Sequence, residues 1–358
     1  MNVSLKYRCF VLIVFSSSAS SVSQVSNWRN DAGNHNYGIP GFCPSGTQCI
    51  PLGQCSLLYK VFNHACAYSN RIGEMGCGYE GSGLVCCPTT NAASRLTSNA
   101  QTCGTPLVSA GTHNELGANP WVARVTYKNS VTGDLKFPCS GSIISNRVVI
   151  TAAHCAVTKS ENYKLYAVRV GEWSTISDLD CGEEFCARPV QDITISHVVI
   201  HPGYEQQSFK DNIALLVLNS RINYTVTAQP ICLPQQWSIT SNYGVLVGWG
   251  KLAGQFEPSP LQQTLQLPIV GLQQCQNVYG RTLPITENHL CVGGVAGRDA
   301  CDGFGGSPLI EQQNGRHFII GILSFGSDRC GAPGIPSVYL NLKRYINWIN
   351  ENIPTFRN

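Results

Sequence analysis

Cysteine constrains this chain more than any other residue. The 358-residue sequence contains 18 cysteines, and two of them, Cys86 and Cys87, are adjacent. Disulfides persist outside the reducing cytosol, so this number predicts an exported protein held together by crosslinks. Removal of Cys9 with an expected leader leaves an odd number of cysteines. At least one thiol must then stay free or pair with another chain.

The first 23 residues have the pattern of a secretory signal peptide. Lys6 and Arg8 precede an apolar stretch from Cys9 to Phe15, and small residues follow at cleavage positions. A buried N-terminal strand is the alternative interpretation. No later apolar run is long enough for a membrane helix, so we expect a soluble, secreted protein.

The charge of the chain argues against two classes of partner. The formal net charge is +3 and only 13% of the residues are charged, with both signs scattered along the sequence. Nucleic acids and anionic membranes require concentrated basic patches. We therefore expect neither as a partner.

Cysteine spacing divides the expected mature chain into two modules. After an N-terminal segment (24–41), seven cysteines lie close together in a module at 42–88, which is too short to bury a sufficient core without crosslinks. A zinc site is the alternative, but the adjacent pair and the lack of paired CxxC units favour disulfides. A small, polar linker follows at 89–107. Its Arg95 is either a processing site for a trypsin-like protease or an ordinary solvated side chain.

The remaining domain, 108–354, reads as all-β. Short β-branched runs alternate with turn signals, which is typical of a barrel or sandwich. The runs are Trp121–Tyr127, Ser142–Thr151, Ala167–Trp173, Ile193–His201, Ile213–Leu218, Tyr243–Gly248 and Phe318–Phe325. Tyr345, Ile346, Ile349 and Ile353 recur at helical spacing and predict a terminal amphipathic helix.

Three motifs in this domain follow the chain order histidine, aspartate, nucleophile loop. They are Thr151–Cys155, Asp211–Leu216 and Asp299–Leu309. On these residues the chain resembles the chymotrypsin-like serine proteases over 103–358. The resemblance implies an all-β, double antiparallel β-barrel with a C-terminal helix, in which Asp211 and His154 form a retained hydrogen-bonded pair. It also implies the disulfides Cys103–Cys232, Cys139–Cys155, Cys181–Cys186, Cys275–Cys291 and Cys301–Cys330.

The first module resembles the clip domain of arthropod proteases. The likeness lies in the spacing of Cys43, Cys49 and Cys55 and in the segment Val85–Pro88. It implies the pairs Cys43–Cys86, Cys49–Cys77 and Cys55–Cys87. Cys66 has no place in this scheme and is the odd thiol, available for self-association.

The nucleophile motif departs from the pattern of an active relative, which reads Gly-Asp-Ser-Gly-Gly-Pro. Here the segment Gly303–Pro308 places Gly305 where the nucleophile belongs, and glycine has no side chain with which to attack. Ser307 lies two residues further on, up to roughly 7 Å along an extended chain. A general base needs its partner at about 3 Å. The sequence therefore predicts a pseudoprotease, with an active enzyme using a displaced nucleophile as the alternative.

Two further departures concern activation. In the family, cleavage after a basic residue frees an ammonium that inserts beside the aspartate preceding the serine. Leu107 replaces the basic residue and Phe304 replaces that aspartate. An ammonium buried opposite Phe304 would lack its countercharge, which costs several kcal/mol.

Other motif positions leave alternatives open. Asp299, Ser324, Gly326 and Ser337 correspond to a pocket for Arg or Lys, narrowed by Ser337, which we interpret as a relic rather than a working ligand site. Glu172, with Asp178, Asp180, Glu183 and Glu184, suggests either a weak Ca²⁺ loop or an ordinary solvated acidic loop. Asn223-Tyr224-Thr225 is a glycosylation sequon. No cofactor is expected to be required.

The combination of modules resembles the insect clip-domain serine protease homologues. That resemblance implies a non-catalytic role in haemolymph or venom, binding clip-domain proteases, prophenoloxidase or other cascade proteins and so promoting or blocking melanisation. The alternative outside this class is a structural or pattern-binding protein that acts through its clip module alone.

Overall fold

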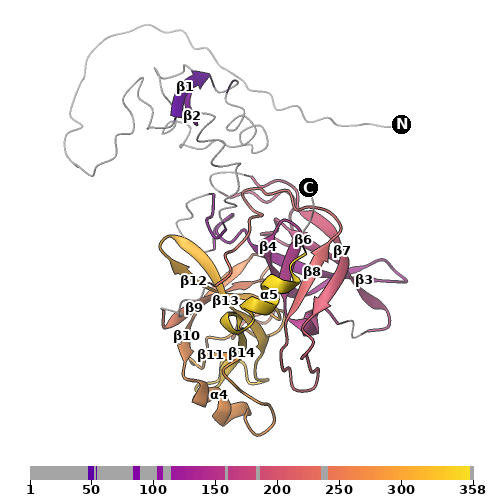
Figure 1. Cartoon of the computed structure of the whole chain (residues 1–358), viewed down its shortest axis with the longest axis vertical. Helices are drawn as coiled ribbons and strands as arrows, with labels where there is room; N and C mark the ends of the chain where they lie inside the picture. The colour runs from indigo at the N-terminus through magenta and orange to yellow at the C-terminus, as the bar shows by residue number, and fades with distance from the viewer. Residues whose placement is uncertain are drawn as a thin grey trace, which may run out of the picture. The chain divides into compact units, whose positions relative to one another are not determined.

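A computed structural model of the chain describes residues 47–51, 54, 84–88, 103–107, 114–157, 160–182, 186–234 and 241–354. Its main body consists of two closed, six-stranded antiparallel barrels that follow one another along the chain (Figure 1). The predicted double barrel with a C-terminal helix is confirmed.

The first barrel closes in the order β3-β4-β5-β8-β7-β6. Its strands are β3 (Val122–Asn129), β4 (Leu135–Ser145), β5 (Val148–Thr151), β6 (Tyr163–Val170), β7 (Gln191–Ile200) and β8 (Ala214–Leu218). The expected run Ser142–Thr151 is the end of β4, a turn and all of β5. Every side chain of β8 is buried, which explains why its sequence is continuously apolar rather than alternating.

The second barrel closes in the order β10-β11-β14-β13-β12-β9. Its strands are β9 (Tyr243–Gly248), β10 (Gln263–Val270), β11 (His289–Gly293), β12 (Pro308–Gln313), β13 (Arg316–Phe325) and β14 (Pro336–Asn341). A short helix, α4 (Leu272–Tyr279), leaves β10 and is linked back to β11 by the Cys275–Cys291 disulfide.

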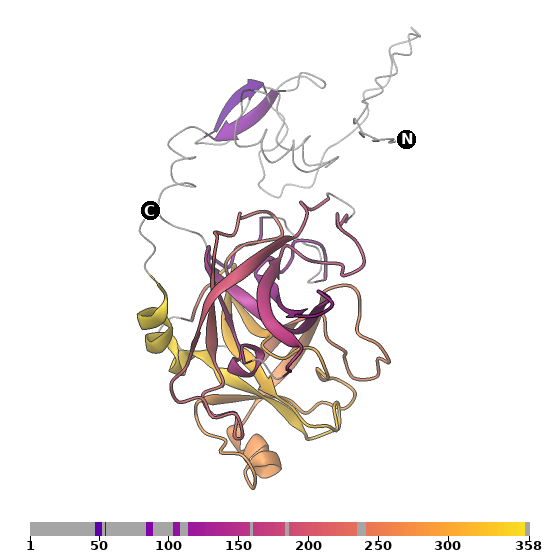
Figure 2. The ribbon, with the colours of Figure 1, turned by 90° about the vertical axis from the view of Figure 1, so that its right-hand side faces the viewer.

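The core joins the two barrels into one packed body. A single buried cluster includes Trp121 and Ile150 of the first barrel together with Ile319 and Leu340 of the second. The terminal helix α5 (Ile346–Asn352) adds Ile349 to this cluster, and it lies against the barrels in the side view of Figure 2. The predicted amphipathic segment is therefore a packed helix, preceded by the 3-10 turn η3 (Leu342–Arg344).

The N-terminal module is described only by one strand pair. β1 (Thr47–Pro51) pairs antiparallel with β2 (Leu84–Pro88), with Cys49 opposite Cys86 in the register. Cys49 is disulfide-bonded. Cys43, Cys55, Cys66 and Cys77, the leader and Arg95 lie outside the described residues, so the three clip-module pairings stay predictions.

Five disulfides are present in the barrel domain, and they are the five pairs that the resemblance implies. They are Cys103–Cys232, Cys139–Cys155, Cys181–Cys186, Cys275–Cys291 and Cys301–Cys330. The first of them fastens Cys103 to the connection between the two barrels, and His317 of β13 donates its backbone N–H to the Gly104 carbonyl at 2.7 Å. Among the described residues, no helix combines the length and the apolar character needed to cross a bilayer.

The disulfides should contribute unequally to stability. Cys103–Cys232 closes a separation of 129 residues and Cys181–Cys186 one of only five. The entropy that a crosslink removes from the unfolded chain grows with the length of the loop it closes. Replacing Cys103 and Cys232 by alanines should therefore lower the free energy of unfolding by about 5 kcal/mol, and replacing Cys181 and Cys186 should lower it by about 2 kcal/mol. Urea unfolding under non-reducing conditions measures both losses. Equal losses, or the reverse order, would contradict this account.

Candidate functional site

His154 occupies the short turn that follows β5. This turn, η2 (Ala153–Cys155), starts at the edge of the first barrel, and the Ala153 N–H bonds to the Asn212 carbonyl at 3.0 Å. The His154 backbone N–H donates to Asn212 Oδ1 at 2.9 Å. The backbone before β8 therefore holds the histidine turn in place.

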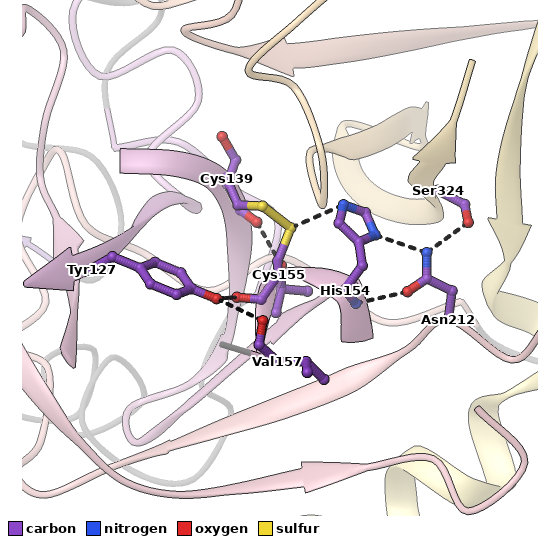
Figure 3. Close-up of a disulfide and its surroundings, with 9 residues drawn as sticks. Tyr127, Cys139, His154, Cys155, Val157, Asn212 and Ser324 are labelled. Carbon is purple, nitrogen blue, oxygen red and sulfur yellow. Dashed lines mark hydrogen bonds between the residues drawn. A yellow bond between two sulfur atoms is a disulfide. The ribbon is translucent and has the colours of Figure 1, made fainter. Parts of the chain in front are cut away.

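The side chain that contacts the imidazole is Asn212, not Asp211. Asn212 Nδ2 lies 2.9 Å from His154 Nδ1 and 2.8 Å from Ser324 Oγ, and the amide is fully buried (Figure 3). The amide orientation is determined by its other end, because a backbone N–H can only be met by the oxygen. The nitrogen must therefore face His154.

This orientation determines the protonation of the imidazole. Asn212 Nδ2 can only donate, so His154 Nδ1 must accept and carries no hydrogen. The neutral ring then holds its hydrogen on Nε2, the nitrogen that faces the cleft. A general base would need a free lone pair on that same nitrogen.

Asp211 points elsewhere, so its predicted pairing with His154 is wrong. The Tyr345 O–H donates to Asp211 Oδ1 at 2.8 Å, Asn288 Nδ2 lies 3.5 Å from the same oxygen, and His201 Nδ1 lies 3.8 Å from Oδ2. Asp211 has a positive φ of 47°, which turns its side chain toward the residues that precede α5. Its carboxylate therefore fastens the C-terminal segment to the barrels.

Gly305 lies directly beside the imidazole. A Cβ at this position would be 2.8 Å from His154 Nε2 and 3.5 Å from the sulfurs of both Cys139 and Cys155. His154 Nε2 is itself 3.4 Å from Cys155 Sγ (Figure 3). The predicted nucleophile position is thus next to His154 in space, and it carries no side chain.

Ser307, the alternative nucleophile, lies away from the cleft. Its side chain is fully buried, and a Cβ on Gly248 would lie 2.7 Å from its Oγ. Its hydroxyl has no hydrogen-bond partner among the described residues, and it does not line the cleft around His154. A substrate in the cleft has no access to it.

Phe304 fills the interior behind this loop. Its ring is 1% exposed and belongs to a buried cluster with Leu246, Leu309 and Tyr339. A Cβ on Gly250 would lie 2.2 Å from this ring, so the glycine is required for the ring to fit. An apolar core therefore occupies the position at which the family pattern has an aspartate.

Two of the four residues predicted to form a specificity pocket contact each other and are buried. Ser337 donates its hydroxyl to Asp299 Oδ1 at 3.0 Å, and a Cβ on Gly326 would lie 2.9 Å from Ser337 Oγ. Asp299 is 3% exposed, and burial raises the pKa of its carboxyl despite hydrogen bonds from Ser337, Ala300 and Gly331. Ser324 and Gly326 line the cleft, whereas Asp299 and Ser337 do not.

The cleft itself is retained. It has a volume of about 710 Å³ and is lined from both barrels, by His154 and Tyr163 on one side and by Ser324, Phe325 and Gly326 on the other. Lys136 and Lys251 contribute cationic groups and Asp302 and Asp328 acidic ones. A cavity of this size falls within the range of ligand-binding clefts.

The described acidic residues of the predicted calcium loop have protein partners. The Glu172 carboxylate lies 3.5 Å from Arg124 and 3.4 Å from Arg169, so two guanidinium groups surround it. Burial raises its pKa, against the lowering by these arginines. The calcium site stays an untested prediction, and Glu183 and Glu184 lie outside the described residues.

Asp178 and Asp180 are engaged by the backbone of their own loop. Asp180 accepts the N–H groups of Trp173 and Ser174, both at 2.9 Å, and Asp178 accepts that of Val190 at 3.3 Å. Beside the cleft, Cys139, Cys155 and His154 cluster within 4.8 Å, but the two sulfurs form a disulfide and offer no thiolates.

The sequon residue and the residue at the family's cleavage position are both exposed. The sequon residue Asn223 is exposed, and its backbone is held by two hydrogen bonds to Gln191, at 2.9 Å each. Leu107 is 62% exposed at the position where the family has its basic cleavage residue. Glycosylation of Asn223 stays a prediction.

Sequence reasoning missed Asn212. Asp211 and Asn212 are adjacent, and the left-handed backbone at Asp211 (φ 47°) turns its carboxylate away from the imidazole while Asn212 faces it. The prediction chose Asp211 because an aspartate orients the histidine in active relatives. The sequence signal for Asn212 is that its amide, which can also hydrogen-bond to an imidazole, stands next to Asp211.

Comparison with known proteins identifies the family. The trypsin family model matches residues 108–349. The chain is 33% identical to CLIP domain-containing serine protease B4 of Anopheles gambiae over 86% of its own length and 89% of that protein's. It is 34% identical to phenoloxidase-activating factor 1 and 33% to phenoloxidase-activating factor 3, both of Holotrichia diomphalia. These matches cover 87% and 85% of this chain and 92% and 90% of the relatives.

The tautomer of His154 can be measured directly. Long-range ¹H–¹⁵N correlation spectra at neutral pH should show the hydrogen on Nε2, because Asn212 donates to Nδ1. Asn212→Asp supplies an acceptor at the same place and should move the hydrogen to Nδ1. A native spectrum with an Nδ1 hydrogen would contradict the assignment, and Ser145→Ala, away from this pair, is the control.

Proposed function

The chain belongs to the insect CLIP-domain serine proteases of the trypsin family, and on that premise we propose that it is a secreted, non-catalytic homologue. In this proposal it binds proteases or their zymogens and modulates an extracellular proteolytic cascade, prophenoloxidase activation in the first instance. The observation that carries the proposal is the pairing of Gly305 with a histidine held by Asn212. Two of the three groups that acyl transfer needs are then replaced.

The magnitudes support loss of turnover rather than reduced turnover. Removing the serine nucleophile costs about a millionfold in kcat. An amide in place of the orienting carboxylate costs about 10⁴-fold by itself, because the imidazole takes the wrong tautomer. These effects are not additive, since the groups act as a unit, but either one alone removes useful proteolysis.

The activation machinery supports the same proposal. An ammonium inserted beside Phe304 would find an apolar core, and Leu107 offers nothing for a trypsin-like activator to recognise. Asp299 is covered by Ser337, so the pocket offers no accessible carboxylate to a basic side chain. That covering supports the interpretation of the pocket as a relic.

What the domain retains is a surface for binding. The open cleft of about 710 Å³ could hold a segment of a protease or zymogen without turning it over. Relatives named as phenoloxidase-activating factors motivate the choice of cascade. A protease with a displaced nucleophile is disfavoured by the burial of Ser307. A protein that acts through its clip module alone would be recognised because the isolated clip module would bind whatever the whole chain binds.

If the chain is non-catalytic, restoring the replaced residues should increase its activity step by step. The native chain should not hydrolyse arginyl peptide anilides or react with a fluorophosphonate. Gly305→Ser should remain about 10⁴-fold below an active CLIP-domain protease, because Asn212 keeps the imidazole in the wrong tautomer. Gly305→Ser combined with Asn212→Asp should react faster with the fluorophosphonate than either single variant. Labelling of the native chain that Ser307→Ala abolishes would refute the proposal.

The binding half is tested in a reconstituted cascade. Purified chain, prophenoloxidase and an active CLIP-domain protease are combined, and phenoloxidase output is followed beside cleavage of a small peptide by the protease. We expect output to rise or fall with peptide cleavage unchanged, since a binding protein alters the encounter and not the enzyme. Lys251→Glu, in the cleft, should weaken the effect, and Lys210→Glu, paired with Glu205 on an exposed loop, should not. Unchanged output would remove the cascade role.

A further inference from the structure

The Cys139–Cys155 disulfide lies in the wall of the cleft. It links β4 to the histidine turn, and both cysteines line the cavity of about 710 Å³ (Figure 3). Cys139 is the more accessible of the two, at 8% exposure against 1% for Cys155. A structural disulfide is ordinarily protected from thiols by the side chains around it.

Gly305 lines the same cleft and leaves the two sulfurs without a neighbouring side chain at this position. A Cβ at Gly305 would contact both sulfurs at 3.5 Å. The same glycine that leaves His154 without a nucleophile therefore reduces the packing over the disulfide. Cys275–Cys291 offers a comparison, because its two cysteines are also 16 positions apart but are packed among Tyr279, Ile285 and Val338.

The imidazole of His154 can donate a hydrogen bond to Cys155 Sγ. His154 Nε2 is 3.4 Å from Cys155 Sγ, and the amide of Asn212 places the hydrogen of the ring on Nε2. This N–H points toward the sulfur and would stabilise negative charge that develops there. A better-stabilised leaving thiolate speeds thiol–disulfide exchange.

We propose that Cys139–Cys155 is a thiol-exchange site for a low-molecular-weight thiol of the glutathione class. The thiolate attacks Cys139 Sγ and forms a mixed disulfide with it while the Cys139–Cys155 bond breaks. The electron pair stays on Cys155 Sγ as a thiolate, hydrogen-bonded to His154 Nε2–H, and takes a proton from water. No net oxidation occurs, because one disulfide replaces another. This site does not depend on the proposed cascade function.

The test uses the full, folded chain and reduced glutathione as the probe. After timed exposure, free thiols are blocked with N-ethylmaleimide and the peptides are mapped by mass spectrometry. Glutathione should appear on Cys139 and the maleimide on Cys155. This reaction should be at least about tenfold faster than any reaction at Cys275–Cys291, because the first pair lines the cleft and has a stabilised leaving group, whereas the second is packed in a buried cluster.

A pair of glycine variants tests the role of Gly305, whose added Cβ would meet both the sulfurs and, at 2.8 Å, His154 Nε2. Gly305→Ala places a Cβ against both sulfurs and should slow the reaction severalfold, whereas Gly271→Ala adds a Cβ with nothing within 4 Å and should not. Equal rates at the two native disulfides would overturn the proposal even if Gly305→Ala failed to fold. Unchanged kinetics in folded Gly305→Ala, or glutathione on Cys155 instead of Cys139, would also overturn it.

Discussion

The amide of Asn212 connects the two barrels at the cleft, since its nitrogen donates to His154 of the first barrel and to Ser324 of the second. Its oxygen is taken by a backbone N–H, so the group cannot turn over without losing three buried hydrogen bonds. The position and the protonation of the imidazole both follow from this one orientation. The chemistry available in the cleft therefore depends on a residue that is neither acid nor base.

The fold was largely predictable because its strongest signals are local. Continuous apolar runs such as Ile213–Leu218 and the cysteine spacings predict buried strands and crosslinks without reference to the rest of the chain. Strands such as Gln263–Val270 gave no such signal, since that run is rich in glutamine, contains a proline and is only partly buried. Its place in the sheet is set by pairing with β9, which is a long-range contact.

The part of the site that lies within one local motif was predictable from the sequence, and the part that depends on distant residues was not. Gly305 and Phe304 stand in a motif whose glycines fix the alignment, and the structure places Gly305 beside His154 and Phe304 in the core. The pairing of Asp211 with His154 was not predictable as wrong, because the left-handed backbone at Asp211 that turns its carboxylate away leaves no signal in the sequence. Its real partner, Tyr345, is 134 residues away, and no local pattern links the two.

The burial of Phe304 has a consequence for how this protein can be regulated. A covalent or binding event shifts a protein between two conformations only through the difference in its interaction free energy with each. Where the family pattern has an aspartate to pair with a new ammonium, this chain has a packed ring. Cutting the chain near Leu107 would therefore not gain the free energy of that ion pair. To that extent the concentration of a partner and its affinity, rather than cleavage, would set the occupancy of the cleft.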